Sequence, residues 1–257
     1  MANSQNYSRH YGKLIVFEGV EGCGKTTQLR RLRDWLTESN WEQFLREQIQ
    51  AEPVMVTREP GGTNLGLELR RLLLEPGEER TIQERAELLL YAADRSQHVE
   101  ELLKPNLLKG MVILCDRFTD STIAYQGYGR GINLSLISQL NQIATNGLES
   151  DLTLWLDIDV EIGLARKRKQ GEITLMEQAD LAFHRRVQQG FTDLAKTHPQ
   201  RIIRIDANQN QDLVAEQIQN ILNEILTKWY KVRSSDFSRS PLNKRTKVLT
   251  TNQINYK

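Results

Sequence analysis

Apolar residues along the chain follow two alternating patterns. Five short runs, residues 14–17, 54–56, 111–115, 152–158 and 202–205, consist mainly of Val, Ile, Leu and Met. Runs of this length and composition are typical of strands buried on both faces, as in a parallel sheet covered by helices. Between them lie longer segments with apolar residues at helical spacing. The pattern therefore predicts a doubly wound α/β domain with a five-stranded parallel sheet and helices on both faces.

Two of the intervening helices have recognisable ends. The first covers residues 65–74, and Thr63 or Asn64 can serve as its N-cap because their side-chain oxygens accept hydrogen bonds from free backbone amides. The second covers residues 81–103 and is expected to stop at Pro105, since proline removes a helical hydrogen bond and crowds the preceding turn.

Composition and charge restrict the class of protein. The 257 residues are 39% apolar and 26% charged, which is typical of one globular domain, and no apolar run reaches the roughly 18 residues of a membrane helix. A net charge of +1 gives no electrostatic case for nucleic acid. We expect a single domain over residues 13–230. Residues 1–12 are polar, without a secretory apolar stretch, and are expected to be disordered; this favours a cytoplasmic location.

The segment 231–257 differs from the rest of the chain. It holds seven Lys or Arg residues and one acid, with many Ser, Asn and Thr. We interpret it as a disordered basic extension, and the alternative is a basic tail that binds a partner.

Cysteine and histidine give no sign of a disulfide or a metal centre. Cys23 and Cys115 lack paired spacing and fit small apolar residues in a reducing compartment. The histidines show no metal-ligand spacing: His10, His98, His184 and His198.

The first apolar run leads into a glycine-rich phosphate-binding loop, or P-loop, of sequence Gly-x-x-x-x-Gly-Lys-Thr. A strand before it and a helix after it are the context in which backbone amides cradle phosphates. Lys25 then contacts the transferring phosphates and Thr26 ligates Mg²⁺. The predicted ATP-binding residues are Gly19, Val20, Glu21, Gly22, Cys23, Gly24, Lys25, Thr26 and Thr27. The alternative is a chance glycine turn.

A P-loop alone does not distinguish GTPases, motor ATPases and small-molecule kinases. The chain lacks the Asp-x-x-Gly and Asn-Lys-x-Asp strings of a switch GTPase, and Asp116-Arg117 follows the third apolar run instead. Asp116 can organise Mg²⁺ and water or accept a proton, and Arg117 can clamp a phosphate with two hydrogen bonds. The alternative interpretation is a structural salt bridge.

Several strings occur in the order typical of one enzyme family. They are Phe17-Glu18-Gly19, Thr57-Arg58-Glu59-Pro60-Gly61-Gly62-Thr63, Tyr91-Ala92-Ala93-Asp94-Arg95 and Ser121-Thr122-x-Ala124-Tyr125-Gln126-Gly127. Over residues 13–230 the sequence resembles the bacterial thymidylate kinases. The resemblance implies a P-loop kinase fold with a mobile lid, transfer of phosphate from ATP with Mg²⁺ to dTMP, and a homodimer.

The resemblance also implies residues that bind the acceptor nucleotide. Tyr91 corresponds to the ring that stacks on thymine, and Arg95, on the same helix face, to the donor to thymine O4. Without the resemblance, core packing is the default interpretation of Tyr91. The remaining predicted contacts lie around the base, sugar and phosphate: Glu21, Glu59, Arg70, Arg117, Ser121, Thr122, Tyr125 and Gln126. A solvated helix position is the alternative for Arg70.

The predicted lid, about residues 166–180, is where the chain departs from the family. An acid at Glu21 marks the bacterial subclass whose catalytic arginines come from the lid. Arg166 and Arg168 match family arginines, but Leu175 occupies the position of another. Such an arginine contributes about 10³–10⁵ in rate. The alternatives are therefore a weakened enzyme, a silent nucleotide-binding relative, or a P-loop kinase for a different nucleotide.

Overall fold

The computed structural model describes residues 12–49, 52–75, 82–169 and 180–232. Five strands form one parallel sheet in the order β2-β3-β1-β4-β5. They are β1 Lys13–Glu18, β2 Val54–Arg58, β3 Val112–Asp116, β4 Leu152–Asp157 and β5 Ile202–Asp206. Each predicted apolar run thus forms a strand, and the five-stranded doubly wound α/β fold is confirmed.

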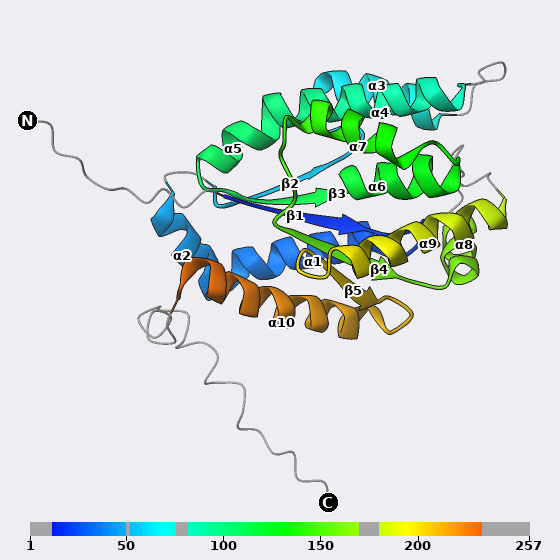
Figure 1. The fold of residues 1–257 in the computed structure, drawn as a ribbon. Coiled ribbons are helices and arrows are strands. Elements are labelled where there is room, and N and C mark those ends of the chain that lie inside the picture. The colour runs from blue at the N-terminus through cyan, green and yellow to red at the C-terminus, as the bar shows by residue number, and fades with distance from the viewer. Residues whose placement is uncertain (1–11, 50–51, 76–81, 170–179, 233–257) are drawn as a thin grey trace, which may run out of the picture.

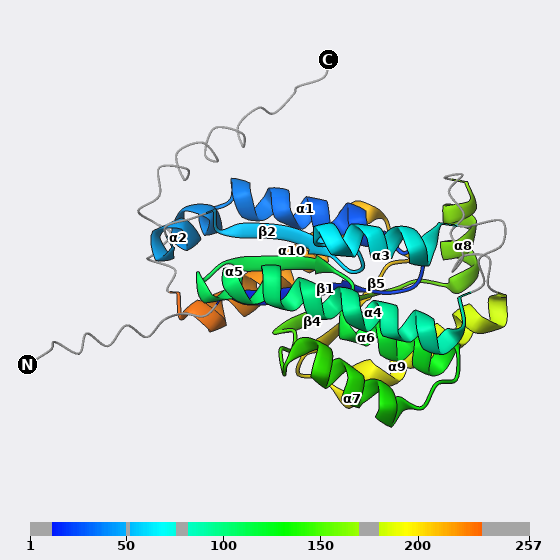
Figure 2. The ribbon, with the colours of Figure 1, turned by 90° about the horizontal axis from the view of Figure 1, so that it is seen from above.

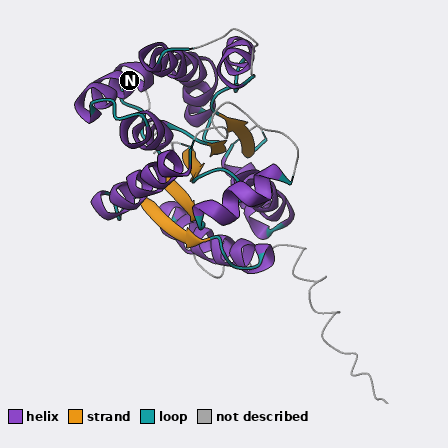
Figure 3. Cartoon of the chain, turned by 90° about the vertical axis from the view of Figure 1, so that its right-hand side faces the viewer, coloured by secondary structure: helices purple, strands orange, loops and turns teal. Residues whose placement is uncertain are grey.

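Helices cover both faces of the sheet (Figures 1 and 3). They are α1 Lys25–Glu38, α2 Asn40–Gln48, α3 Asn64–Leu74, α4 Glu84–His98, α5 Lys104–Leu108, α6 Thr119–Thr122, α7 Leu134–Thr145, α8 Val160–Arg168, α9 Leu181–Thr197 and α10 Gln211–Tyr230. Figure 1 places α1 and α10 below the sheet and α4, α5 and α7 above it. Figure 2, seen from above, shows α4 running along the sheet beside α7.

Side chains alternate between the two faces of β1. Ile15 and Phe17 join the core that includes α1 and α10, whereas Leu14 and Val16 pack with the residues around α5. All four are fully buried. This two-sided burial explains why the strand is a continuous apolar run and places its carboxyl end, where the P-loop begins, at a fixed edge of the sheet.

One helix boundary differs from the prediction. Pro105 does not end the helix, because α4 continues through the π-helical turn η1 Val99–Leu103 into α5, with Pro105 in its first turn. The amide of Lys104 bonds to the carbonyl of Val99, five residues back. The wider turn accommodates a residue that has no amide and that crowds a regular helix. The predicted cap of α3 is Thr63, whose hydroxyl accepts from the amide of Gly66 at 3.0 Å.

Three sequence predictions fall wholly or largely outside the described residues. They concern disorder in residues 1–12, disorder in residues 231–257, and most of the lid, including Leu175.

Candidate active site

A cavity of about 310 Å³ is lined by residues that directly follow β1, β2 and β3. Carboxyl ends of parallel strands are the usual ligand site of such sheets. The predicted residues that line it are Glu21, Gly22, Gly24, Lys25, Thr26, Thr27, Glu59, Arg70, Tyr91, Arg95, Asp116, Arg117, Ser121, Thr122, Tyr125 and Gln126. The structure thus brings most of the predicted site together, although contact with a nucleotide stays a prediction for each.

The P-loop is held by its own lysine and by close backbone packing. Lys25 begins α1, and its Nζ donates to the carbonyls of Gly19 (2.9 Å) and Val20 (3.1 Å). A Cβ on Gly22 would lie 2.0 Å from the carbonyl oxygen of Gly163 in α8. Only glycine allows this approach, which fixes the loop beside α8. Gly19, Val20 and Cys23 are predicted ATP-binding residues outside the cavity lining, and their contact with ATP stays a prediction.

Thr26 and Asp116 supply oxygen atoms at one place. The Thr26 hydroxyl donates to Asp116 Oδ2 at 3.3 Å. Asp116 Oδ1 is buried and has no hydrogen-bond partner within the described part of the chain. A hydroxyl and a carboxylate with an unpaired buried oxygen fit Mg²⁺, which prefers oxygen ligands and keeps several waters. In the described ranges, no group of three or more acids, histidines or cysteines is arranged to hold a metal ion, and Mg²⁺ bound to nucleotide phosphates does not need such a group.

Arg117 links the segment after β3 to the P-loop. Its Nη2 donates to Glu21 Oε1 at 2.9 Å and to the Tyr125 hydroxyl at 3.1 Å, and its Nη1 donates to Ser121 at 3.1 Å. The guanidinium also lies 4.8 Å from the centre of the Tyr125 ring, a cation–π contact. The Arg117 side chain is therefore oriented before any ligand binds.

Glu21 is a carboxylate in a cluster of donors. Burial acts to raise its pKa, but a contact from His184 and the charges of Arg117 and Lys25 outweigh burial and lower the pKa to about 2. The Tyr125 hydroxyl lies 2.7 and 2.8 Å from its two oxygens. Glu21 is therefore ionised at neutral pH, which suits a role toward a metal shell or a hydroxyl.

The side of the cavity predicted to take the base is built from α4 and the π-helical segment η2 Ile123–Gly129. Tyr91 and Arg95 both project from α4 into the cavity, as their spacing predicts. Gln126 donates to Glu87 Oε1 at 2.8 Å, which fixes its amide. The carboxylate of Glu59 accepts from Arg95 Nε at 2.9 Å and lies 2.8 Å from His98 Nδ1, and its contact with an acceptor nucleotide stays a prediction.

Two arginines form a positive wall on the β2 side. Arg70 Nη1 donates to the carbonyl of Pro60 at 3.0 Å, and Arg58 lines the same cavity. Burial, and then the charge of Arg58, lower the pKa of Arg70. The repulsion between the two guanidinium groups is relieved by a bound anion, so this side of the cavity suits a phosphate. Sequence reasoning missed Arg58, although its place at the end of a buried strand was a usable signal.

The α8 side contributes a lysine rather than an arginine. Lys167 lines the cavity, whereas the predicted Arg166 and Arg168 are exposed and outside the lining. Their catalytic role stays a prediction. Leu175 is among the residues that the structure does not describe.

Three further polar residues lie behind the cavity lining, and no sequence pattern predicts their contacts. His184, fully buried in α9, has Nδ1 at 3.5 Å from Glu21 Oε2. His98 and Asn141 contact Glu59 and Arg95. Isolated polar residues within helical patterns do not reveal such contacts, since these depend on how distant segments pack.

Comparison with known proteins gives a consistent result. The family model described as thymidylate kinase matches residues 17–218. A thymidylate kinase of Nostoc punctiforme is 61% identical over 212 residues, covering 82% of this chain and 95% of the relative. One from a Cyanothece strain is 59% identical over 226 residues, covering 85% and 97%. The crystal structure of the thymidylate kinase from Ehrlichia chaffeensis is 35% identical with a TM-score of 0.63, covering 82% of this chain and 99% of that one.

Proposed function

We propose, since the chain belongs to the thymidylate kinase family, that it transfers the γ-phosphoryl group of ATP to dTMP. One observation supports this most directly. The P-loop, the Arg58–Arg70 wall and the Tyr91–Arg95 face open on one cavity, so a donor phosphate and an acceptor nucleotide can meet there. Each surface matches one part of the two substrates.

The reaction needs no covalent enzyme intermediate. An oxygen of the acceptor phosphate forms a bond to the γ-phosphorus, the bond to the β-phosphate oxygen breaks, and the products are ADP and dTDP. Lys25 and Arg117 place positive charge where negative charge develops, and Arg70 holds the acceptor phosphate. Tyr91 stacks on the base, and Thr122 and Gln126 supply polar contacts to it.

Mg²⁺ belongs to the proposal. Thr26 and Asp116 would hold it, and the bound ion would neutralise charge on the β- and γ-phosphates. The hydrogen bond between these residues and the unpaired Asp116 oxygen support the assignment.

We also propose a cytoplasmic homodimer. Two free buried cysteines suit a reducing compartment. Large exposed apolar side chains are found on α4 and on the two helices that pack against it, α3 and α7: Leu65, Leu67, Leu89, Leu134 and Ile143. Exposed apolar side chains on neighbouring helices suit an interface between copies. No helix in the described part of the chain combines the length and apolar character needed to cross a bilayer. Light scattering after size-exclusion chromatography tests the dimer.

The function is tested by measuring ADP release with dTMP, dUMP, dCMP and AMP, with Lys25→Ala as the inactive control. We expect efficient turnover of dTMP. We expect poor but detectable turnover of dUMP, because a single methyl group contributes only about 1–3 kcal/mol. Equal rates for dUMP and dTMP would argue against this pocket assignment. Nucleotide binding without turnover above the control would instead indicate a silent relative.

A further inference from the structure

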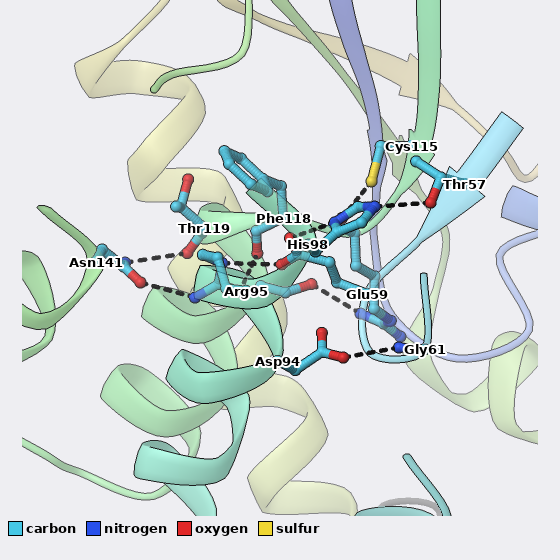
Figure 4. Close-up of polar contacts among 12 residues, drawn as sticks. Thr57, Glu59, Gly61, Asp94, Arg95, His98, Cys115, Phe118, Thr119 and Asn141 are labelled. Atoms are coloured by element: carbon cyan, nitrogen blue, oxygen red, sulfur yellow. Dashed lines mark hydrogen bonds and ion pairs between the residues drawn. The ribbon is translucent and has the colours of Figure 1, made fainter. Parts of the chain in front are cut away.

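Arg95 is fixed by three acceptors from three separate segments (Figure 4). Its Nε donates to Glu59 Oε2 at 2.9 Å, its Nη1 to Asn141 Oδ1 at 2.8 Å and its Nη2 to the carbonyl of Phe118 at 3.1 Å. The side chain is only 2% exposed. Its guanidinium also lies 5.6 Å from the centre of the Phe118 ring. The group is therefore held in one plane and one orientation.

Counting donors shows what remains for a ligand. A guanidinium carries five N–H groups in a planar fork. The three bonds to Glu59, Asn141 and Phe118 use one N–H on each nitrogen. Within the described part of the chain, Nη1 and Nη2 each keep one N–H without a partner, and Arg95 lines the cavity. A base with a carbonyl oxygen at this point satisfies these donors, whereas an amino group there does not.

His98 holds the Glu59 end of the network. Its Nδ1 lies 2.8 Å from Glu59 Oε1 and its Nε2 lies 2.7 Å from the Thr57 hydroxyl. With the proton on Nδ1, the imidazole donates to the carboxylate and accepts from Thr57, so each contact is satisfied. His98 is fully buried and outside the cavity lining. It orients Glu59, which in turn orients Arg95.

Asn141 holds the opposite side. Its Nδ2 contacts the carbonyl of Thr119 at 3.5 Å, which turns Oδ1 toward Arg95. Asn141 is 8% exposed and, like His98, does not line the cavity. Asn141 therefore acts on a ligand through Arg95, and His98 acts through Glu59, which holds Arg95.

We propose that Asn141 and His98 are positioning residues for base selection: they hold Arg95 so that its two free N–H groups meet a carbonyl at the 4-position of the acceptor base. The inference rests on the proposed function. A site built to donate to a carbonyl rejects an analogue without that acceptor, and this rejection depends on a fixed donor geometry. Loosening Arg95 therefore costs affinity for a 4-oxo base and leaves a 4-amino base unaffected.

The test compares two ligands that differ at one position. Dissociation constants of dTMP and 5-methyl-dCMP are measured by calorimetry for the wild type, Asn141→Leu, Asn141→Asp and Gln142→Leu. We expect Asn141→Leu to weaken the binding of dTMP roughly tenfold and that of 5-methyl-dCMP less than about twofold, since one hydrogen bond to a charged group is lost. Asn141→Asp keeps an acceptor for Arg95 and is expected to restore the wild-type ratio of the two dissociation constants. The exposed neighbour Gln142 gives a matched control that behaves as the wild type.

A merely structural role predicts a different result. In that case Asn141→Leu weakens both ligands and ATP to the same extent, and the ratio of dissociation constants stays at the wild-type value. If Asn141 positions Arg95 as proposed, the KM of Asn141→Leu for dTMP rises with little change in kcat, because the base is bound equally in the ground state and the transition state. An unchanged ratio, or no rescue by Asn141→Asp, overturns the inference.

His98 supplies an independent pair of variants. His98→Phe removes both polar contacts and is expected to lower selection, whereas His98→Asn keeps a donor near Glu59 and is expected to preserve part of it. If Asn141→Leu does not bind ATP, it has not folded. The same ratio of dissociation constants, measured for His98→Phe and His98→Asn, then tests the inference. Absence of dTMP turnover by the wild type would refute the proposed function. Wild-type selection that survives in every variant would refute only this inference.

Discussion

Nη2 of Arg117 lies 2.9 Å from Oε1 of Glu21, and this bond joins the segment after β3 to the P-loop. The backbone of Arg117 is in the left-handed region, with φ of 71°, which is uncommon outside glycine. Such conformations persist where surrounding contacts over-determine them. The arginine is therefore held against the P-loop before either substrate enters.

Replacing Glu21 by Gln tests this arrangement. The variant keeps the size of the side chain but removes the charge that orients Arg117 and attracts the Tyr125 hydroxyl. We expect kcat/KM for dTMP to fall roughly 10–100-fold, because charge-assisted hydrogen bonds contribute about 1.5–3 kcal/mol. Glu161→Gln, in an exposed pair with Arg185, serves as the control and should keep wild-type activity. Activity of Glu21→Gln within twofold of the wild type would contradict the role.

The cationic side chains of α8 can be ranked by their position. Lys167 lines the cavity, and Arg166 and Arg168 do not. We expect Lys167→Ala to lower kcat at saturating ATP and dTMP by at least tenfold, as loss of a charge near developing phosphate charge predicts. Arg168→Ala is expected to have a smaller effect. A larger loss in Arg168→Ala would favour the assignment made from sequence instead.

The fold and the phosphate-binding loop were accessible from sequence because their signals are local. Five apolar runs predict five strands, and Gly22 and Lys25 occur at fixed spacing within one loop. Physical constraints of this kind need no knowledge of distant segments. Family resemblance then supplied residues such as Tyr91 and Arg95, which local patterns alone do not distinguish from core positions.

The network behind Arg95 was not accessible in this way. His98 and Asn141 are single polar residues in different helices, and they come to lie on opposite sides of the Arg95–Glu59 pair because α4 packs against α7 and β2 lies beside β3. The prediction that the helix stops at Pro105 was wrong for a related reason. A proline ends a regular helix, but the π-helical turn before Pro105 accommodates its ring and its missing amide, and no local residue pattern predicts that turn.

A buried ion pair fixes the first turn of α6 to the start of β5. Asp120 is 2% exposed, and both of its oxygens accept from Arg201, at 2.6 and 2.8 Å. We expect Asp120→Ala to lower the free energy of unfolding by about 3–5 kcal/mol, because the partner charge is left partly buried. Asp212→Ala, in an exposed pair with Arg31, should cost less than about 1 kcal/mol. Urea unfolding at one protein concentration measures both, and equal losses would contradict the distinction.

Glu18 is fully buried at the end of β1, where its carboxyl group anchors the segment that carries the site. Glu18 Oε1 accepts from the amides of Phe118 (2.8 Å) and Ser121 (3.1 Å), and Oε2 accepts from the Ser121 hydroxyl (2.6 Å). Burial, and the nearby charge of Asp120, raise the pKa of Glu18 from 4.5 to about 7, against the opposing effect of Arg117. The folded protein therefore keeps a proton that the unfolded chain loses near pH 4.5.

This difference predicts how stability depends on pH. Glu18 favours the folded state fully below pH 4.5, and that contribution falls as pH rises toward and through 7, since the unfolded chain ionises first. The loss between pH 5 and pH 8 is about 2–3 kcal/mol, from about 1.4 kcal/mol for each unit of pKa. Glu18→Gln keeps the side-chain shape without titrating. The unfolding free energy of the wild type minus that of Glu18→Gln, measured in urea, should therefore decrease by this amount over the range. Parallel pH curves for the two proteins would show that Glu18 titrates normally in the folded state. Asp94, whose pKa burial also raises, to about 6, is present in both proteins and so cancels from the difference.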